Sequence, residues 1–162
     1  MMKRFFAYIL AALLLPALSA CAKVSYRDDL SSQEIADRIT DALQAEGEYV
    51  NAAPDALDDY FQIPATVRDH TVLFHANRNN LDEFGIFHVS DAEKKEMQAL
   101  LVGYLSESLT ANRAWYDSYI PQETPKLRDA EARIFGNYVV YAILSPSDRA
   151  HFFDIIQTIL EK

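Results

Sequence analysis

The stretch AEARIFGNYVVYAIL, residues 130–144, decides how this chain folds. Two runs rich in β-branched and aromatic residues flank Gly136 and Asn137, which are typical turn residues. Glycine at the first turn position favours a type II′ hairpin with Phe135 opposite Tyr138. The charged side chains then share one face of the hairpin, and the apolar side chains share the other, which we expect to face the core. The apolar residues are Ala132, Ile134, Val139, Tyr141 and Ile143.

Two further strand-like runs lie upstream, TVLFH at residues 71–75 and FGIFHV at residues 84–89, with a polar segment between them. They predict a second hairpin, in which we place His75 opposite Phe84 and Thr71 opposite His88. His75 and His88 then share a face but lie about 13 Å apart along it, too far to bind one metal ion.

Capping boxes mark the starts of two helices, because a serine and a glutamate three residues later can satisfy the free backbone groups of a first turn. The box at Ser31 predicts a helix over residues 32–46, and the box at Ser90 predicts a long helix over residues 90–119. The apolar stripe of the long helix consists of Met97, Leu100, Leu101, Tyr104, Leu105 and Leu109.

Prolines place two more helices. Pro54 begins a short helix that ends near Pro64, because the residue before a proline leaves the helical region. Ser145 and Pro146 fit the N-cap and the first position of a last helix, with Asp148 in its first turn.

The resulting order is α, α, ββ, α, ββ, α, without the alternation that builds a parallel sheet. It predicts an α+β fold of two layers, with one antiparallel sheet of about four strands, formed by two hairpins, and helices packed on one face. We assign residues 1–20 to a signal peptide, residues 21–30 to a membrane-proximal tether and residues 31–162 to a single domain. A domain of this size buries enough surface for a core without disulfides.

The N-terminus has the pattern of a secretory signal. Lys3 and Arg4 precede an apolar run over residues 5–15, which as a helix spans roughly 17 Å and cannot cross a hydrocarbon core of ~30 Å. The residues LSAC, 18–21, resemble the bacterial lipobox, in which the chain is cut between the positions of Ala20 and Cys21 and the cysteine is acylated. Cys21 is also the only cysteine in the chain.

The sequence therefore predicts lipidation of Cys21, membrane lipid as a partner, and a lipid-anchored location on the extracytoplasmic face of the cell membrane. The alternative for Cys21 is an incidental small residue at a plain signal-peptidase site, since Ser19 and Ala20 come close to the required pattern of small residues.

Negative charge is concentrated near the predicted anchor. Residues 28–59 hold ten carboxylates against one base, Arg38, in a chain whose net charge is -9. We interpret this stretch as a solvated helix face that anionic lipids repel; the alternatives are a face for a basic partner and a loose divalent-cation site. Lys and Arg form no cluster in the sequence, which excludes nucleic acid as a partner of the whole chain.

No motif assigns a catalytic residue, a metal ligand or a cofactor. Four scattered glycines make no phosphate loop, no Gly-x-Ser-x-Gly elbow is present, and one cysteine cannot build a metal cluster. Asp58 and Asp59 are adjacent on a helix and point apart, which argues against a hydrolase dyad. We interpret the histidines as half-buried or edge residues: His70, His75, His88 and His151.

One cluster is a candidate binding patch. Arg113, Trp115, Tyr116 and Tyr119 lie near the end of the long helix, and their spacing covers a wide arc of it. Arginine among aromatic side chains is typical of recognition patches. The alternative is that these residues pack the end of the helix on the sheet.

Several short motifs occur in one order: EFGIF at residues 83–87, YIPQE at 119–123, KL at 126–127 with AE at 130–131, and GNYVVY at 136–141. In this order the chain resembles the bacterial lipoprotein domain of unknown function 4358, found mostly in Firmicutes, over about residues 30 to 160. The resemblance implies a membrane-anchored extracytoplasmic domain. It implies no reaction, ligand or catalytic residue.

Together these features predict a non-catalytic binding or accessory module at the cell envelope, with an envelope protein or peptide as its partner. The alternative is a cell-envelope hydrolase acting on a glycan or peptide, and a third interpretation is an accessory subunit of a membrane complex. An enzyme should have a concave pocket with an acid or histidine of shifted pKa, whereas a binding module should expose an aromatic patch.

Overall fold

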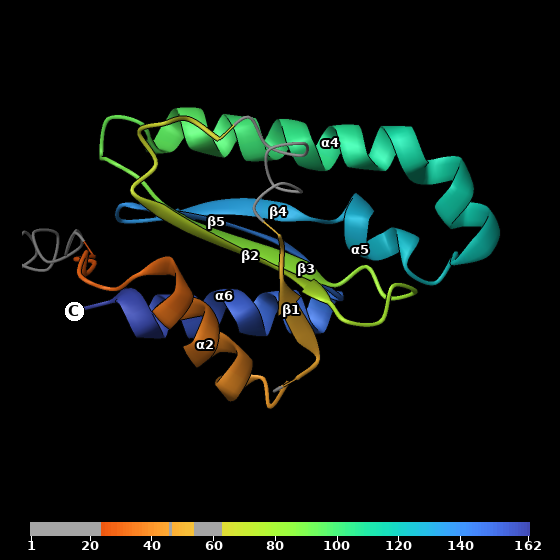
Figure 1. The fold of residues 1–162 in the computed structure, drawn as a ribbon, viewed down its shortest axis with the longest axis horizontal. Coiled ribbons are helices and arrows are strands. Elements are labelled where there is room, and N and C mark those ends of the chain that lie inside the picture. Colours follow the sequence, from red (N-terminus) through yellow and green to blue (C-terminus); the bar gives the residue numbers. More distant parts are fainter. Residues whose placement is uncertain (1–23, 46, 54–62) are drawn as a thin grey trace, which may run out of the picture.

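The computed structural model describes residues 24–45, 47–53 and 63–162. They form one antiparallel sheet of order β1-β2-β3-β5-β4 with helices around it, which confirms the predicted α+β fold (Figure 1). The strands are β1 (Tyr49–Asn51), β2 (Asp69–His75), β3 (Glu83–His88), β4 (Glu131–Phe135) and β5 (Tyr138–Ile143). The helices are α2 (Ser32–Ala42), α4 (Lys94–Tyr119), α5 (Thr124–Arg128) and α6 (Pro146–Leu160).

Helices cover both faces of the sheet. Figure 1 shows α4 above the strands and α2 and α6 below them. The prediction of two layers with helices on one face is therefore wrong. The reason lies in β3 and β5, which are buried at every residue. Because successive side chains of a strand point to opposite faces, a strand that is buried throughout needs a covering layer on each side.

Each face has its own apolar core. On the face covered by α2 and α6, which we call the closed face, the core includes Ile35, Ile39, Phe84, Ile86, Tyr138, Val140, Phe152, Phe153 and Ile156. On the face covered by α4, which we call the open face, it includes Val72, Phe87, Met97, Leu101, Leu105, Leu127, Val139, Tyr141 and Ile143. The five residues predicted to face the core all lie on the open face. The alternate residues of the same hairpin are buried on the closed face: Phe135, Tyr138, Val140 and Ala142.

The predicted turn between β4 and β5 is confirmed. Phe135 pairs with Tyr138, and Gly136 has φ of 62°. Asn137 does not share this left-handed conformation, which is the pattern of a type II′ turn. Gly136 is needed for a second reason, because a Cβ there would lie 2.7 Å from the Cβ of Tyr26.

The hairpin of β2 and β3 forms, but its register differs from the prediction by two residues. Leu73 pairs with Phe84, and Asp69 pairs with His88. Two local turns shorten the loop between the strands. The side chain of Asn77 accepts a hydrogen bond from the backbone N–H of Asn79, and the side chain of Asn80 accepts one from the backbone N–H of Asp82. These local hydrogen bonds, which a strand pattern does not reveal, set the register.

Two of the three predicted helix caps are confirmed. Ser31 forms a capping box with Glu34, and Ser145 accepts from the backbone N–H of Asp148 at 3.3 Å. The box at Ser90 does not cap a helix, because α4 begins at Lys94 and the Ser90 hydroxyl instead donates to the Glu93 carboxylate. The helix α2 also ends earlier than predicted, and β1 and α5 were not predicted at all.

The segment after the predicted anchor is attached to the domain. The backbone N–H of Arg27 donates to the carbonyl of Leu160 at 2.8 Å, and that of Lys162 donates to the carbonyl of Ser25 at 2.9 Å. Residues 24–30, which we assigned to a tether, are therefore bonded to the C-terminal end of the chain.

Several predictions fall on residues that the structure does not describe: the signal peptide over residues 1–20, the cleavage site between Ala20 and Cys21, and most of the short helix after Pro54. Within the described ranges, no helix is both long enough and apolar enough to cross a bilayer.

Candidate functional site

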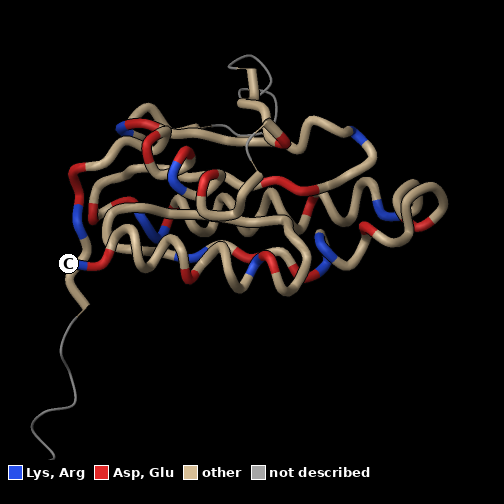
Figure 2. The backbone as a smooth tube through the Cα atoms, turned by 90° about the horizontal axis from the view of Figure 1, so that it is seen from below, with Lys and Arg blue, Asp and Glu red and all other residues tan. Residues whose placement is uncertain are grey.

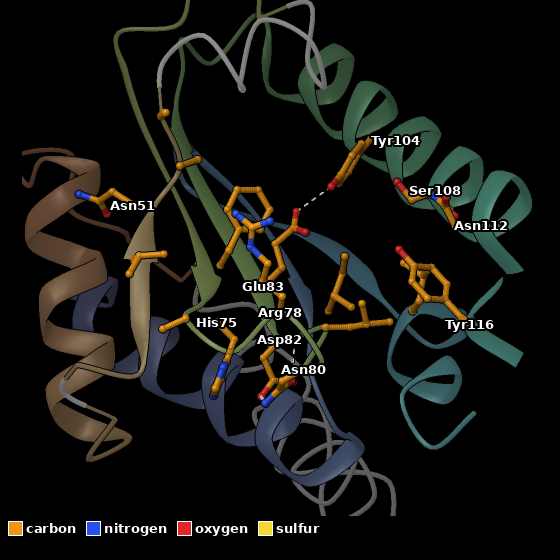
Figure 3. Close-up of a pocket in the computed structure, with 18 residues that line it drawn as sticks. Asn51, His75, Arg78, Asn80, Asp82, Glu83, Tyr104, Ser108, Asn112 and Tyr116 are labelled. Atoms are coloured by element: carbon orange, nitrogen blue, oxygen red, sulfur yellow. Dashed lines mark hydrogen bonds between the residues drawn. The ribbon is translucent and has the colours of Figure 1, made fainter. Parts of the chain in front are cut away.

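The open face is hollowed at one end by a groove of about 780 Å³. One wall is the C-terminal half of α4, and the other is formed by β1, the end of β2 and the loop that joins β2 to β3 (Figure 3). Phe74, Leu127 and Ile143 contribute apolar parts of the lining. The fully buried residues of α4, Met97, Leu101 and Leu105, lie in its first half, and the groove lies beside its second half, where Leu109 and Tyr116 are only partly buried.

A row of hydrogen-bonding side chains lines the α4 wall. Tyr104, Ser108, Asn112 and Tyr116 are spaced four residues apart, so they follow one ridge of the helix. We call them the polar ridge. Figure 3 shows the polar ridge across the groove from Glu83, with Arg78 and Asn80 on the same opposite side. A helix that only packed on the sheet would place apolar residues along such a ridge.

Glu83 is the one carboxylic acid buried in the groove lining. It begins β3, and its Oε1 atom accepts from the hydroxyl of Tyr104 at 2.8 Å and from the hydroxyl of Tyr141. Burial raises the pKa of Glu83 to about 7, against the hydrogen bonds from Tyr141 and Tyr104, which lower it. Near neutral pH the group is therefore present in both forms, and its protonated form can donate a hydrogen bond to a ligand.

Gly85 makes the contact between Tyr141 and Glu83 feasible. Gly85 pairs directly with Tyr141 across β3 and β5, and a Cβ at this position would lie 2.3 Å from Cε1 of the tyrosine ring. Because glycine leaves this space empty, the ring lies across the strand and its hydroxyl reaches the carboxylate two residues away.

A buried cation fixes the loop that forms the opposite wall. The Nζ atom of Lys126 in α5 lies 2.7 Å from Asp82 and 2.8 Å from Glu123, and it donates to Asn80 at 2.9 Å. The three charged side chains of this cluster are mostly buried. Desolvation opposes the charge of Lys126, but the two carboxylates outweigh it and raise its pKa. The wall of the groove is therefore held rigidly against α5.

The edge of the sheet borders the groove at β1. The backbone N–H of Ala52 donates to the carbonyl of Val72, and the carbonyl of Glu48 accepts from the N–H of Ala76. Because alternate residues of an antiparallel strand bond to the same neighbour, residues 48, 50 and 52 are the ones that face β2. The backbone groups of Tyr49 and Asn51 point the other way, out of the sheet. Among the described residues, no strand pairs with this side of β1.

The structure brings together three of the four residues of the predicted binding patch. The Trp115 ring lies 5.4 Å from that of Tyr116 and 5.3 Å from that of Tyr119, with Trp115 51% and Tyr119 71% exposed. Tyr116 belongs to the polar ridge, so the patch is continuous with the groove. Arg113 instead pairs with Asp117 at 3.4 Å and lines a separate hollow beside α5.

His88 has structural partners. Its ring lies between two carboxylates, with Nε2 at 2.7 Å from Asp28 and Nδ1 at 3.2 Å from Asp69, and it stacks on Tyr138 with ring centroids 4.4 Å apart. Through Asp28 it holds the N-terminal segment on the closed face. This pairing explains why a histidine is buried at the end of β3.

The other histidines are dispersed. His70 stacks on Phe87, the Nδ1 of His75 accepts from the backbone N–H of Asn77 at 2.9 Å, and His151 is exposed on α6. No group of three or more His, Cys, Asp or Glu side chains in the described ranges could hold a metal ion.

Charged residues lie close to partners of opposite sign on much of the surface. Figure 2 shows basic positions next to acidic ones in several places. Arg27 lies 2.7 Å from Asp29, and Arg133 lies 2.7 Å from Glu131.

Sequence reasoning did not identify Glu83, the polar ridge or the edge at β1. Glu83 lies just outside the strand predicted over residues 84–89, and Tyr104 was counted with the apolar stripe. The four-residue spacing of the polar ridge was a signal that could have been found, because it continues past Leu109, where the apolar stripe ends.

No family model, curated protein or solved structure matches this chain. The resemblance to the lipoprotein domain of unknown function 4358 therefore stays a prediction.

Proposed function

We propose that this chain is a lipid-anchored, extracytoplasmic, non-catalytic binding module whose ligand occupies the groove. The observation that carries the proposal is the groove itself, in which a row of hydrogen-bonding side chains on α4 faces a buried acid. A site of this volume with convergent polar groups is typical of ligand binding.

The groove favours binding over catalysis. Hydrolysis of a glycan uses two carboxyl groups with separate roles. Asp82 is the carboxylate next to Glu83, but adjacent residues of an extended chain point to opposite sides, and Asp82 is already paired with Lys126. Both tyrosine hydroxyls on Glu83 are bonded to the same oxygen, which fixes the group in place.

The cell-envelope hydrolase remains the second candidate because of one observation. A buried acid whose pKa is raised to about 7 is suited to general acid catalysis near neutral pH. Incubation of isolated cell walls with the protein tests it. Release of soluble fragments by the wild type and not by Glu83→Gln would favour the hydrolase.

The proposed anchor is the acylated Cys21. The domain begins to bond to itself at Ser25, four residues later. Four residues extend at most about 14 Å, so an anchored domain would lie close to the bilayer surface. The proposed partners are membrane lipid at Cys21 and an envelope protein or peptide in the groove.

In-cell cross-linking with mass spectrometry tests the proposal. A photoreactive amino acid at Ser108 faces the groove, and the same amino acid at Ser106, an exposed position of α4 outside the groove lining, is the matched control. We expect a recurrent adduct from position 108 and not from position 106, together with a diacylated Cys21 in the N-terminal peptide.

Equal adducts from both positions would contradict a site in the groove. An unmodified N-terminus that starts elsewhere would contradict the lipid anchor. The two results are independent, so the location and the binding site are tested separately.

A further inference from the structure

We propose that the ligand is an extended segment of polypeptide that adds to β1 as a sixth strand and places one side chain in the groove. This inference rests on the proposed function, because it assigns the chemistry of the ligand to the same site. It follows from the edge at β1, from the contrast with the edge at β4, and from the position of Val50.

The edge at β1 offers backbone groups that have no hydrogen-bond partner in the part of the chain that the structure describes. Tyr49 and Asn51 each direct an N–H and a carbonyl out of the sheet, in the alternation that a neighbouring strand requires. Such groups are a template for strand addition, in which main-chain hydrogen bonds supply affinity for an extended peptide.

The opposite edge of the sheet is partly occupied. On β4 the residues that bond to β5 include Phe135 and Arg133, so the backbone of Ala132 points outward. Its carbonyl accepts from the side-chain amide of Gln98 in α4 at 2.8 Å. One outward group of β4 is thus bonded by a side chain. Among the described residues, no side chain bonds to the outward backbone groups of β1.

The side chain of Val50 links the edge to the groove. Val50 is 50% exposed and lines the groove, whereas its neighbour Tyr49 packs against the closed-face core. Side chains opposite each other on paired strands lie on the same face, about 5 Å apart. The peptide residue next to Val50 would therefore direct its side chain into the groove.

The lining selects the chemistry of that side chain. Glu83 lies three strand spacings, about 14 Å, from the added strand, and the groove residues nearest to this position are Val50 and, one strand further in, Phe74. We infer an apolar side chain, such as that of Val, Leu or Ile, at this position of the peptide. Its neighbours along the peptide point to the other face and are less constrained.

The test uses the full-length protein in a lipid nanodisc and peptides selected on it from a displayed library of random nonapeptides. The strongest peptide is synthesised and its Kd measured for the wild type and three variants. Asn51→Pro removes the outward N–H at a position that does not bond to β2, and Asn51→Ala is the matched control, because it removes only the side chain. Ser108→Trp fills the groove.

We expect Asn51→Pro to weaken binding at least about tenfold, and Asn51→Ala to change it less than about threefold. In the wild type the amide protons of Tyr49 and Asn51 should become protected from exchange when the peptide binds. Methylation of alternate backbone nitrogens of the peptide should abolish binding, whereas methylation of the nitrogens between them should be tolerated. This last measurement does not depend on the folding of any variant.

Unchanged binding to Asn51→Pro, or no added protection at Tyr49 and Asn51, would overturn the strand addition. If Ser108→Trp nevertheless abolishes binding of the same peptide, the peptide binds in the groove without adding a strand. In that case only the further inference fails, and the proposed function stands. Failure to select any peptide, together with a glycan adduct at position 108, would likewise overturn the inference and leave the proposed function standing.

Discussion

The two faces of the sheet are built from alternate residues of the same strands, but they are covered in different ways. On the closed face aromatic rings form a continuous cluster, with Phe84 at 5.1 Å from Phe152 and Phe152 at 5.2 Å from Phe153. On the open face Leu105 is the last fully buried residue of α4, Leu109 is only partly buried, and the polar ridge lines the groove. The difference shows that the covering helix, and not the strand pattern, decides where a site forms.

The comparison also separates stability from function. Apolar burial is the main source of folding free energy, so the continuous core of the closed face should supply most of it. The groove end of the open face carries polar groups that contribute little to folding but can bind a ligand. Variants on the two faces should therefore have different effects.

The largest expected effect is from the closed face. Phe152→Ala should lower the free energy of unfolding by about 3 to 5 kcal/mol, because it leaves a cavity among packed rings. Ser108→Ala on the polar ridge should change it by less than about 0.5 kcal/mol. Urea denaturation of both variants measures these changes. Similar losses of unfolding free energy would show that the two faces contribute equally to stability.

The next effect concerns pH and the buried acid of the open face. Burial raises the pKa of Glu83 to about 7, from the 4.5 that is usual for a glutamate in water. Between these values the folded protein binds a proton that the unfolded chain has lost, so this group makes stability fall as pH rises from about 4.5 to about 7.

The substitution Glu83→Gln keeps an acceptor for both tyrosines but removes the titration. Relative to the wild type it should gain stability between pH 4.5 and pH 8 by an amount of the order of 3 kcal/mol. Denaturation of both proteins at pH 5 and at pH 8 measures the gain. If the free energies of unfolding of the two proteins differ by the same amount at pH 5 and at pH 8, Glu83 does not titrate in this range.

The smallest effect distinguishes two glycines. Gly85→Ala should destabilise the protein by about 1 to 3 kcal/mol, because its Cβ would displace the Tyr141 ring and its bond to Glu83. Gly103→Ala is the matched control: nothing lies within 4 Å of the new Cβ, and alanine favours a helix interior. It should stabilise by up to about 1 kcal/mol. Thermal unfolding measures both, and a neutral Gly85→Ala would mean that Tyr141 moves without cost.

Local chemistry could be predicted from sequence, and long-range packing could not. Gly136 and the serines at residues 31 and 145 act through neighbours in the chain, so their turn and caps were predicted. The coverage of both faces depends on where α4 lies, although the continuous apolar residues of β3 and β5 were a signal of it. The three residues of β1 are too few to form a pattern.

The candidate site was missed for a related reason. Glu83 is polar, and its burial depends on Tyr104 and Tyr141, which are distant in sequence. The aromatic residues Trp115, Tyr116 and Tyr119 were predicted because they cluster in sequence as well as in space. Convergence of residues from β3, α4 and β5 is a property of the fold alone.

The bonds between residues 25–27 and the C-terminal end have a mechanical consequence. A pull on the N-terminal segment is carried through these bonds to the end of α6, on the closed face. It does not pass through α4, α5 or the loop held by Lys126, which form the groove. The groove can therefore keep its shape if the proposed anchor at Cys21 puts the domain under tension.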